Sequence, residues 1–285
     1  FPKICRRSVL LFVAAALVLG GWAGAARAGE TTWRLSTVSD PRHPNNIAIE
    51  GMIKRIKERT GGKLNIVVFP SNTLGNPNDV TEQGRLGVVD LVLLSPSHLD
   101  KYDPAFATLM VPFQFDGFEH AWRAEDGAGF TWYKERAQKA GFELLANFAF
   151  GFRNITNNVR PIQAPDDLKG LKMRVPPELQ VKAAMEALGA VTMTVPLPEV
   201  YMALANRVVD GQCNPVALIH SLKYYEVQKY LSIVNYAYTN AILTMGARKW
   251  NSVPEEWRKI LVEEATAAGK EARKILLENE AKYIA

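Results

Sequence analysis

Cysteine and histidine are scarce in this sequence, and their placement excludes two common ways of holding a small fold together. The only cysteines are Cys5 and Cys213, and Cys5 lies in an N-terminal segment that we expect to be removed, so we expect no disulfide within the mature chain. The four histidines are scattered without the spacing of metal ligands, and we expect neither a metal site nor another cofactor. The fold must therefore depend on a hydrophobic core, for which the chain is long enough.

Long apolar runs are absent except near the N-terminus. Three basic residues among the first seven precede an uncharged stretch over residues 8–26, which ends in Ala26-Arg27-Ala28. A basic start, an apolar stretch and an A-x-A site are typical of a secretory signal peptide, so we predict that residues 1–28 are cleaved off and that the mature protein is periplasmic. The alternative is an uncleaved membrane anchor, which the glycines at positions 20, 21 and 24 disfavour.

The excess of positive charge also belongs to this segment. The whole chain carries a formal net charge of +5, but Lys3, Arg6, Arg7 and Arg27 lie in the predicted signal peptide, which contains no acidic residue. The formal net charge of the mature chain would therefore be 5 − 4 = +1, and no basic run remains in its sequence. This balance argues against a nucleic-acid partner.

Strand-like and helix-like patterns alternate along the rest of the chain, which predicts an α/β fold. The mostly apolar stretch over residues 89–94 favours a parallel sheet covered on both faces. Two lobes joined by short strand crossings, with a ligand cleft between them, fit a chain of this length without a long linker. The expected strands cover residues 33–38, 64–69, 89–94, 142–150, 171–175, 191–195 and 208–212, and the expected helices cover residues 45–60, 79–86, 118–140 (interrupted by the glycines at 127 and 129), 178–188 and 199–205.

The last expected element is a long helix. Ser252-Val-Pro-Glu255 predicts a capping box with Pro254 in the first turn. No stop signal follows before Ala285, so we expect a further C-terminal segment. Apolar residues at steps of three and four predict the buried stripe of this helix, formed by Trp257, Ile260, Leu261, Ala265, Ala268, Ala272, Ile275 and Leu276.

Two arginines without an obvious acidic partner are the main candidates for a binding site. Arg153 directly follows the expected strand over residues 142–150, and Arg174 lies in the strand over residues 171–175, on the face opposite its apolar neighbours. A buried guanidinium is costly unless it is neutralised, and a ligand carboxylate matches its planar fork of donors. The alternatives are a solvated strand arginine for Arg174 and a structural salt bridge for Arg153.

Six short segments in a fixed order make the chain resemble the periplasmic solute-binding proteins of tripartite ATP-independent periplasmic (TRAP) transporters, of the DctP type. The resemblance runs from about residue 33 to residue 285. The segments are Phe69-Pro-Ser-Asn-Thr-Leu-Gly75, Gly151-Phe-Arg-Asn-Ile-Thr-Asn157, Asp166-Asp-Leu-Lys-Gly-Leu-Lys-Met-Arg-Val-Pro176, Glu199-Val-Tyr-Met-Ala-Leu204, Val209-Asp-Gly-Gln-Cys-Asn-Pro215 and Tyr225-Glu-Val-Gln-Lys-Tyr230.

The resemblance implies a two-lobed periplasmic-binding-protein fold, type II-like, with a ligand cleft between the lobes and a long helix that spans both. It places residues 29–150 and about 239–278 in lobe I, and residues 151–238 and about 279–285 in lobe II. It implies a binding protein and not an enzyme, a monomer that captures a small organic acid and delivers it to the membrane subunits of a TRAP permease.

The resemblance also implies a set of site residues. Arg174 is the principal carboxylate ligand and Arg153 a second one, while Asn214 offers a donor and an acceptor unless it is only a turn residue before Pro215. Cys213 stands where many members of the family have glutamate, and we expect it to pack in the core. The remaining candidates are two residues of a possible surface loop, Ser95 and His98, and three pocket-wall residues, Leu197, Asn235 and Tyr236, the last of which is alternatively a core residue.

The ligand and the partner stay open at this stage. A hydroxylated acid such as a uronate or another sugar acid is our first expectation, and a C4-dicarboxylate is the second. One alternative is a ligand sensor that presents its closed form to a receptor. Another is a secreted hydrolase, but the sequence contains neither a Gly-x-Ser-x-Gly elbow nor a His-Glu-x-x-His motif.

Overall fold

The computed structural model describes residues 30–285, so the predicted signal peptide lies outside the described residues. This part of the chain forms one eight-stranded sheet in the order β2-β1-β3-β8-β4-β7-β5-β6, covered by helices. The strands are β1 (Thr31–Thr37), β2 (Leu64–Phe69), β3 (Leu91–Leu94), β4 (Phe142–Asn157), β5 (Lys172–Val175), β6 (Val191–Thr194), β7 (Gly211–Pro215) and β8 (Tyr230–Gly246).

The expected helices lie close to their predicted positions, and the expected break at Gly127 separates α4 from α5, whereas the short helices α8 and α9 were not predicted. The α-helices are α2 (Pro44–Arg59), α3 (Pro77–Leu86), α4 (Phe118–Asp126), α5 (Ala128–Lys139), α6 (Leu179–Ala187), α7 (Val200–Ala205), α8 (Val216–Ser221), α9 (Ala247–Ser252) and α10 (Glu255–Ile284). Short 3₁₀ turns are η1 (Pro96–Leu99), η2 (Pro104–Met110), η3 (Pro165–Leu168), η4 (Leu197–Glu199) and η5 (Tyr224–Glu226).

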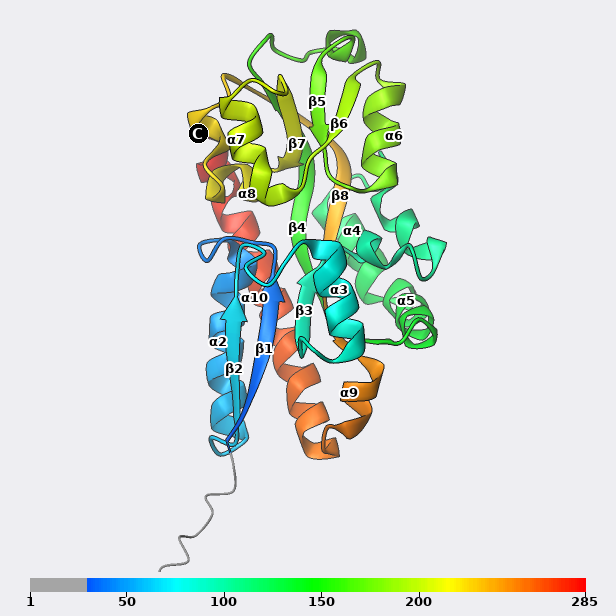
Figure 1. Ribbon diagram of the computed structural model, residues 1–285, viewed down its shortest axis with the longest axis vertical. Helices are drawn as coiled ribbons and strands as arrows, with labels where there is room; N and C mark the ends of the chain where they lie inside the picture. Colours follow the sequence, from blue (N-terminus) through cyan, green and yellow to red (C-terminus); the bar gives the residue numbers. More distant parts are fainter. Residues whose placement is uncertain (1–29) are drawn as a thin grey trace, which may run out of the picture.

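The fold has two lobes, as predicted. Strands β1–β3 with α2 and α3 lie in the lower half of Figure 1, and β5–β7 with α6–α8 lie in the upper half. Within each group the strands pair in parallel, β1 with β2 and β3, and β5 with β6 and β7. The prediction of a parallel sheet is wrong for the middle of the sheet, where β3–β8, β8–β4 and β4–β7 are antiparallel pairs.

Two long strands, not the expected short crossings, connect the lobes. β4 and β8 contain 16 and 17 residues and run through both halves of the molecule (Figure 1). Gly151 of β4 pairs with Thr239 of β8, and the register of the pair shifts between Ala149 and Gly151. The lobe boundaries expected from the resemblance, after residues 150 and 238, therefore fall at paired positions beside an irregularity of the sheet. The division of the chain at these positions stays a prediction.

β8 was not predicted, because its residues lack the alternation of polar and apolar side chains that marks a half-buried strand. From Tyr236 onward every residue of this strand is buried, including the polar Thr239, Asn240 and Thr244. A strand covered on both faces shows no alternation of polar and apolar residues. The polar residues of β8 also interrupt the continuous apolar run by which such a strand is otherwise predicted.

Helix α10 spans both lobes and packs along α2, β4 and α8. Most of the predicted stripe is buried, while Trp257 and Ile275 are half-buried. At its C-terminal end Tyr283 stacks on His220 of α8, with the ring centroids 4.3 Å apart. The predicted capping box is wrong: the Ser252 hydroxyl donates to the carbonyl of Lys249 (2.7 Å), because Ser252 ends α9.

Candidate functional site

A cavity of about 280 Å³ lies between the two lobes. The loop after β3 and the N-terminal end of α3 line it from lobe I. The segments that follow β5 and β6, together with β7 and α8, line it from lobe II, and β4 and β8 contribute residues from the crossing strands. Ligands of α/β proteins bind beyond the carboxyl ends of strands. The cavity lies beyond the carboxyl ends of β3, β5 and β6.

Arg174 lies on β5 and is buried in the wall of this cavity. Its side chain is 1% exposed, so the alternative of a solvated strand arginine is wrong. The Nε atom donates to the carbonyl of Val195 over 2.8 Å, whereas Nη1 is buried without a hydrogen-bond partner among the described residues. Within residues 30–285, Arg174 forms no ion pair with an acidic side chain. Burial lowers the pKa of the Arg174 guanidinium, which reflects the cost of holding its charge away from water.

Arg153 lies inside β4 and not after it, because this strand continues to Asn157. Its Nη2 atom donates to the carbonyl of Cys213 and to the side-chain oxygen of Asn214 (3.4 Å), and Nη1 donates to Thr239 (3.4 Å). The Nε atom is buried and has no hydrogen-bond partner in the part of the chain that the structure describes. Since none of these partners is an acid, the alternative of a structural salt bridge is wrong within the described part of the chain.

Asn214 is a strand residue and not a turn residue. The strand expected at residues 208–212 is β7, which starts only at Gly211 and ends at Pro215. The reason for this shift is that Val209 packs beside α7 in the core of lobe II. Asn214 thereby enters the cavity wall, where it accepts from Arg153, while its own amide group donates to Gln212 (2.6 Å).

The prediction for Cys213 is confirmed, since it is buried and its sulfur accepts from the hydroxyl of Tyr236 over 3.1 Å. Tyr236 is buried behind Arg153 and does not line the cavity, which makes it a core residue. Asn235 is exposed and also lies outside the cavity lining. It sits with φ 45° in a bulge of β8 whose amides donate to Asn154, and this bulge turns it outward.

Ser95 and His98 line the cavity, together with the half-buried Leu197. Ser95, between β3 and η1, and His98, within η1, are both buried, so a surface loop is excluded. The Ser95 hydroxyl bonds to that of Ser97 (2.8 Å), and Ser97 donates to the Glu178 carboxylate of lobe II (2.7 Å). Burial lowers the pKa of His98, which keeps its imidazole neutral.

Sequence reasoning missed Glu178, Asn78 and Thr239, which also line the cavity. Nothing in their residue types marks them, and Glu178 had been counted as the start of a helix. One signal was available for Glu178: it follows Pro176 and Pro177 directly beyond the carboxyl end of β5, where ligand residues are common.

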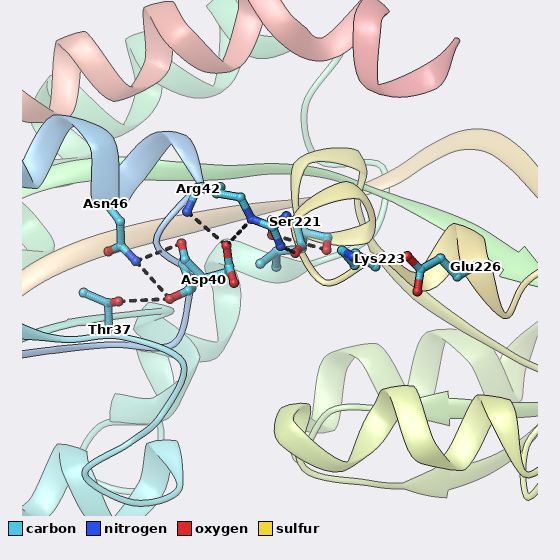
Figure 2. A network of polar contacts seen from close by, with 9 residues as sticks. Thr37, Asp40, Arg42, Asn46, Ser221, Lys223 and Glu226 are labelled. Carbon is cyan, nitrogen blue, oxygen red and sulfur yellow. Dashed lines mark hydrogen bonds and ion pairs between the residues drawn. The ribbon is translucent and has the colours of Figure 1, made fainter.

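A second contact joins the lobes outside the cavity (Figure 2). Arg42, in the loop after β1, donates from Nη2 to the carbonyl of Ser221 at the end of α8 (2.7 Å) and from Nε to Asp40 (2.8 Å). The side chain of Asn46 donates to the carbonyls of Ser39 (2.9 Å) and Asp40 (3.0 Å), which fixes the loop on α2. The lobes are thus connected by Arg42–Ser221 and by Ser97–Glu178.

Residues 35–285 match the family described as bacterial extracellular solute-binding protein, family 7 (DctP). The chain belongs to the DctP family. A relative, the 2,3-diketo-L-gulonate-binding periplasmic protein YiaO of Escherichia coli K12, is 32% identical over 246 residues, which cover 86% of this chain and 74% of YiaO. This DctP-family chain is thus a solute-binding protein of the TRAP type, as the resemblance implied.

Solved structures of TRAP periplasmic solute-binding proteins share this fold. One from Polaromonas sp. JS666, bound to D-erythronate, is 30% identical with a TM-score of 0.86, and the match covers 90% of this chain and 84% of that one. Another from Sulfurospirillum deleyianum, with bound succinate, is 27% identical with a TM-score of 0.85, covering 90% and 83%. In the described part of the DctP-family chain no helix is both long and apolar enough to cross a bilayer.

Proposed function

We propose that this DctP-family protein captures a small organic acid in the cavity between its lobes and delivers it to the membrane subunits of a TRAP permease. The observation that carries the proposal is the buried guanidinium of Arg174, which lines the cavity and whose Nη1 atom has no partner within residues 30–285. A buried charge without a counter-ion is strongly unfavourable, and a ligand carboxylate supplies the missing partner.

Arg153 supports the same role from β4. Its Nε atom is also buried without a partner, and Thr239 and Asn214 hold its Nη atoms in place. Because arginine presents its donors in a rigid fork, one carboxylate can take two parallel hydrogen bonds from it. The acids named for the relatives, a diketo sugar acid, D-erythronate and succinate, all carry the carboxylate that this arrangement requires.

The protein works in the periplasm in this proposal, with residues 1–28 as its export signal, and it binds its ligand without changing it. A receptor in place of the permease would use the same cavity. Pull-down from membranes with the ligand-loaded protein distinguishes the two partners.

Mass spectrometry of the protein purified under native conditions, followed by a thermal-shift panel of organic acids, tests the proposal. A ligand that binds only the folded state raises the melting temperature. We expect a co-purified carboxylic acid, and a rise in melting temperature that saturates with the concentration of that acid. A panel in which neutral sugars raise the melting temperature and acids do not would contradict the proposal.

A further inference from the structure

The charged residues that line the cavity carry one net positive charge. They are Arg153, Arg174 and Glu178, so their charges sum to 2 − 1 = +1. His98 adds nothing, because its burial lowers the pKa of its imidazole and keeps it neutral. A single carboxylate therefore neutralises the lining. A dicarboxylate would leave an excess negative charge in a buried site, and a zwitterion would leave the positive charge uncompensated.

Glu178 places an unsatisfied acceptor in the same cavity. Its side chain is 7% exposed, and its Oε1 atom accepts from the Ser97 hydroxyl over 2.7 Å. The Oε2 atom is buried without a hydrogen-bond partner within residues 30–285. A buried carboxylate oxygen needs a donor, and leaving it unpaired costs more than a hydrogen bond to it gains. The ligand must therefore bring a donor to Glu178.

His98 adds a second acceptor beside Glu178. Its Nδ1 atom lies 3.3 Å from the amide oxygen of Asn78, which can only accept, so Nδ1 carries the proton of the neutral ring. The other nitrogen, Nε2, is then an acceptor and lies 3.9 Å from Oε1 of Glu178. Two neighbouring acceptors cannot satisfy each other, but ligand hydroxyl groups can donate to both.

We propose that Glu178 and His98 form an acceptor subsite that selects a hydroxylated monocarboxylate and rejects dicarboxylates of the same length. The inference rests on the proposed function, because Arg174 must first bind the carboxylate of the ligand. Glu178 then requires a hydroxyl group where a dicarboxylate would place its second carboxylate. Like charges brought together in a buried site repel each other strongly, and this repulsion is the source of the discrimination.

Calorimetry with two matched pairs of acids tests this subsite. D-erythronate and succinate have four carbons each, while galactonate and galactarate have six and differ only at one terminal group. We expect the wild-type protein to bind the monocarboxylate of at least one pair about tenfold or more tightly than its dicarboxylate. The substitution Glu178→Gln keeps the shape and the acceptor for Ser97 but removes the charge, and should reduce this preference at least about tenfold.

The matched control is Glu199→Gln, which removes one charge from an exposed residue of the same lobe and should leave the preference unchanged. A purely structural role for Glu178 would lower both affinities by the same factor, and this result would overturn the inference. So would a wild-type protein that binds the dicarboxylate of each pair at least as tightly, although acid binding itself would then stand. If no acid of the wider panel binds, the proposed function fails together with the inference.

Discussion

Arg42 and Ser221 connect the two lobes through a single directed hydrogen bond. The guanidinium donates to the Ser221 carbonyl over 2.7 Å, and the Asp40 carboxylate orients it by accepting from its Nε atom over 2.8 Å. The last carbonyl groups of a helix have no hydrogen-bond partner within that helix. The Arg42 guanidinium at the end of α8 therefore takes the place of a water molecule as the donor to the Ser221 carbonyl.

Arg42→Ala should therefore release the bound ligand faster. The contact forms only when the lobes are together, so its loss should raise the dissociation rate about two- to tenfold and leave the association rate nearly unchanged. Stopped-flow fluorescence measures both rates. Lys223→Ala is the control, because Lys223 pairs with Glu226 of its own lobe (3.3 Å) and should not affect release. Equal dissociation rates for Arg42→Ala and the wild type would contradict a role in holding the lobes together.

His43 should make the protein sensitive to mild acid. Burial lowers the pKa of His43 from 6.5 to about 3, and its Nδ1 atom accepts from the backbone amide of Asn45 at the start of α2 (3.2 Å). Between these two pKa values the unfolded chain binds the proton and the folded chain does not. The contribution of His43 is therefore present above pH 6.5 and is lost as the pH falls, by about 1.4 kcal/mol per pH unit.

Urea unfolding at several pH values between 7 and 5 measures this loss against His43→Asn, which keeps a side chain suited to the helix N-cap but does not titrate. The free energy of unfolding of the wild type should fall more steeply with decreasing pH than that of the variant. If the two decline in parallel, another group dominates the acid sensitivity.

Two mid-helix glycines should respond in opposite ways to alanine. A Cβ atom on Gly269 of α10 would lie 2.1 Å from the backbone oxygen of Asn147 on β4, so Gly269→Ala should destabilise the protein by about 1–3 kcal/mol. On Gly51 of α2 the nearest atom is the flexible end of Arg55, at 3.1 Å, and the gain in helix propensity should stabilise by up to about 1 kcal/mol. Denaturant unfolding of both variants measures their free energies of unfolding against that of the wild type. Equal effects would mean that α10 does not pack against β4 at Gly269.

The sequence predicted the residues of the site that lie within its recognisable segments. Arg174 could be placed because alternation along β5 puts it on the face opposite Met173, and because the segment Lys169–Pro176 that contains it holds no acidic residue. Asn214 and Cys213 were singled out through the resemblance of their segment to the DctP family. The expected helices were also close to those observed, since each shows either an apolar face or clear end signals.

The rest depends on contacts between segments that are far apart. Glu178 lines the cavity and accepts a hydrogen bond from Ser97 of the other lobe, which lies 81 positions away in the sequence. The prediction that Asn235 is a pocket-wall residue was wrong, because the side chain of Asn154 stabilises a bulge in β8 that no local sequence pattern reveals. The antiparallel pairs in the middle of the sheet were not predicted, because most of them involve β8. The buried polar residues of β8 interrupt the apolar pattern by which a buried strand is predicted.

Calorimetric titration of Arg174→Ala with the acid that the wild type binds tests the central claim most directly. Arg123→Ala is the control, because it removes an exposed arginine from α4. If Arg174 neutralises the ligand carboxylate, its removal leaves a buried charge unpaired at a cost of about 3–5 kcal/mol, so the affinity should fall at least about a hundredfold. An affinity within a factor of about two of the wild type would contradict the account.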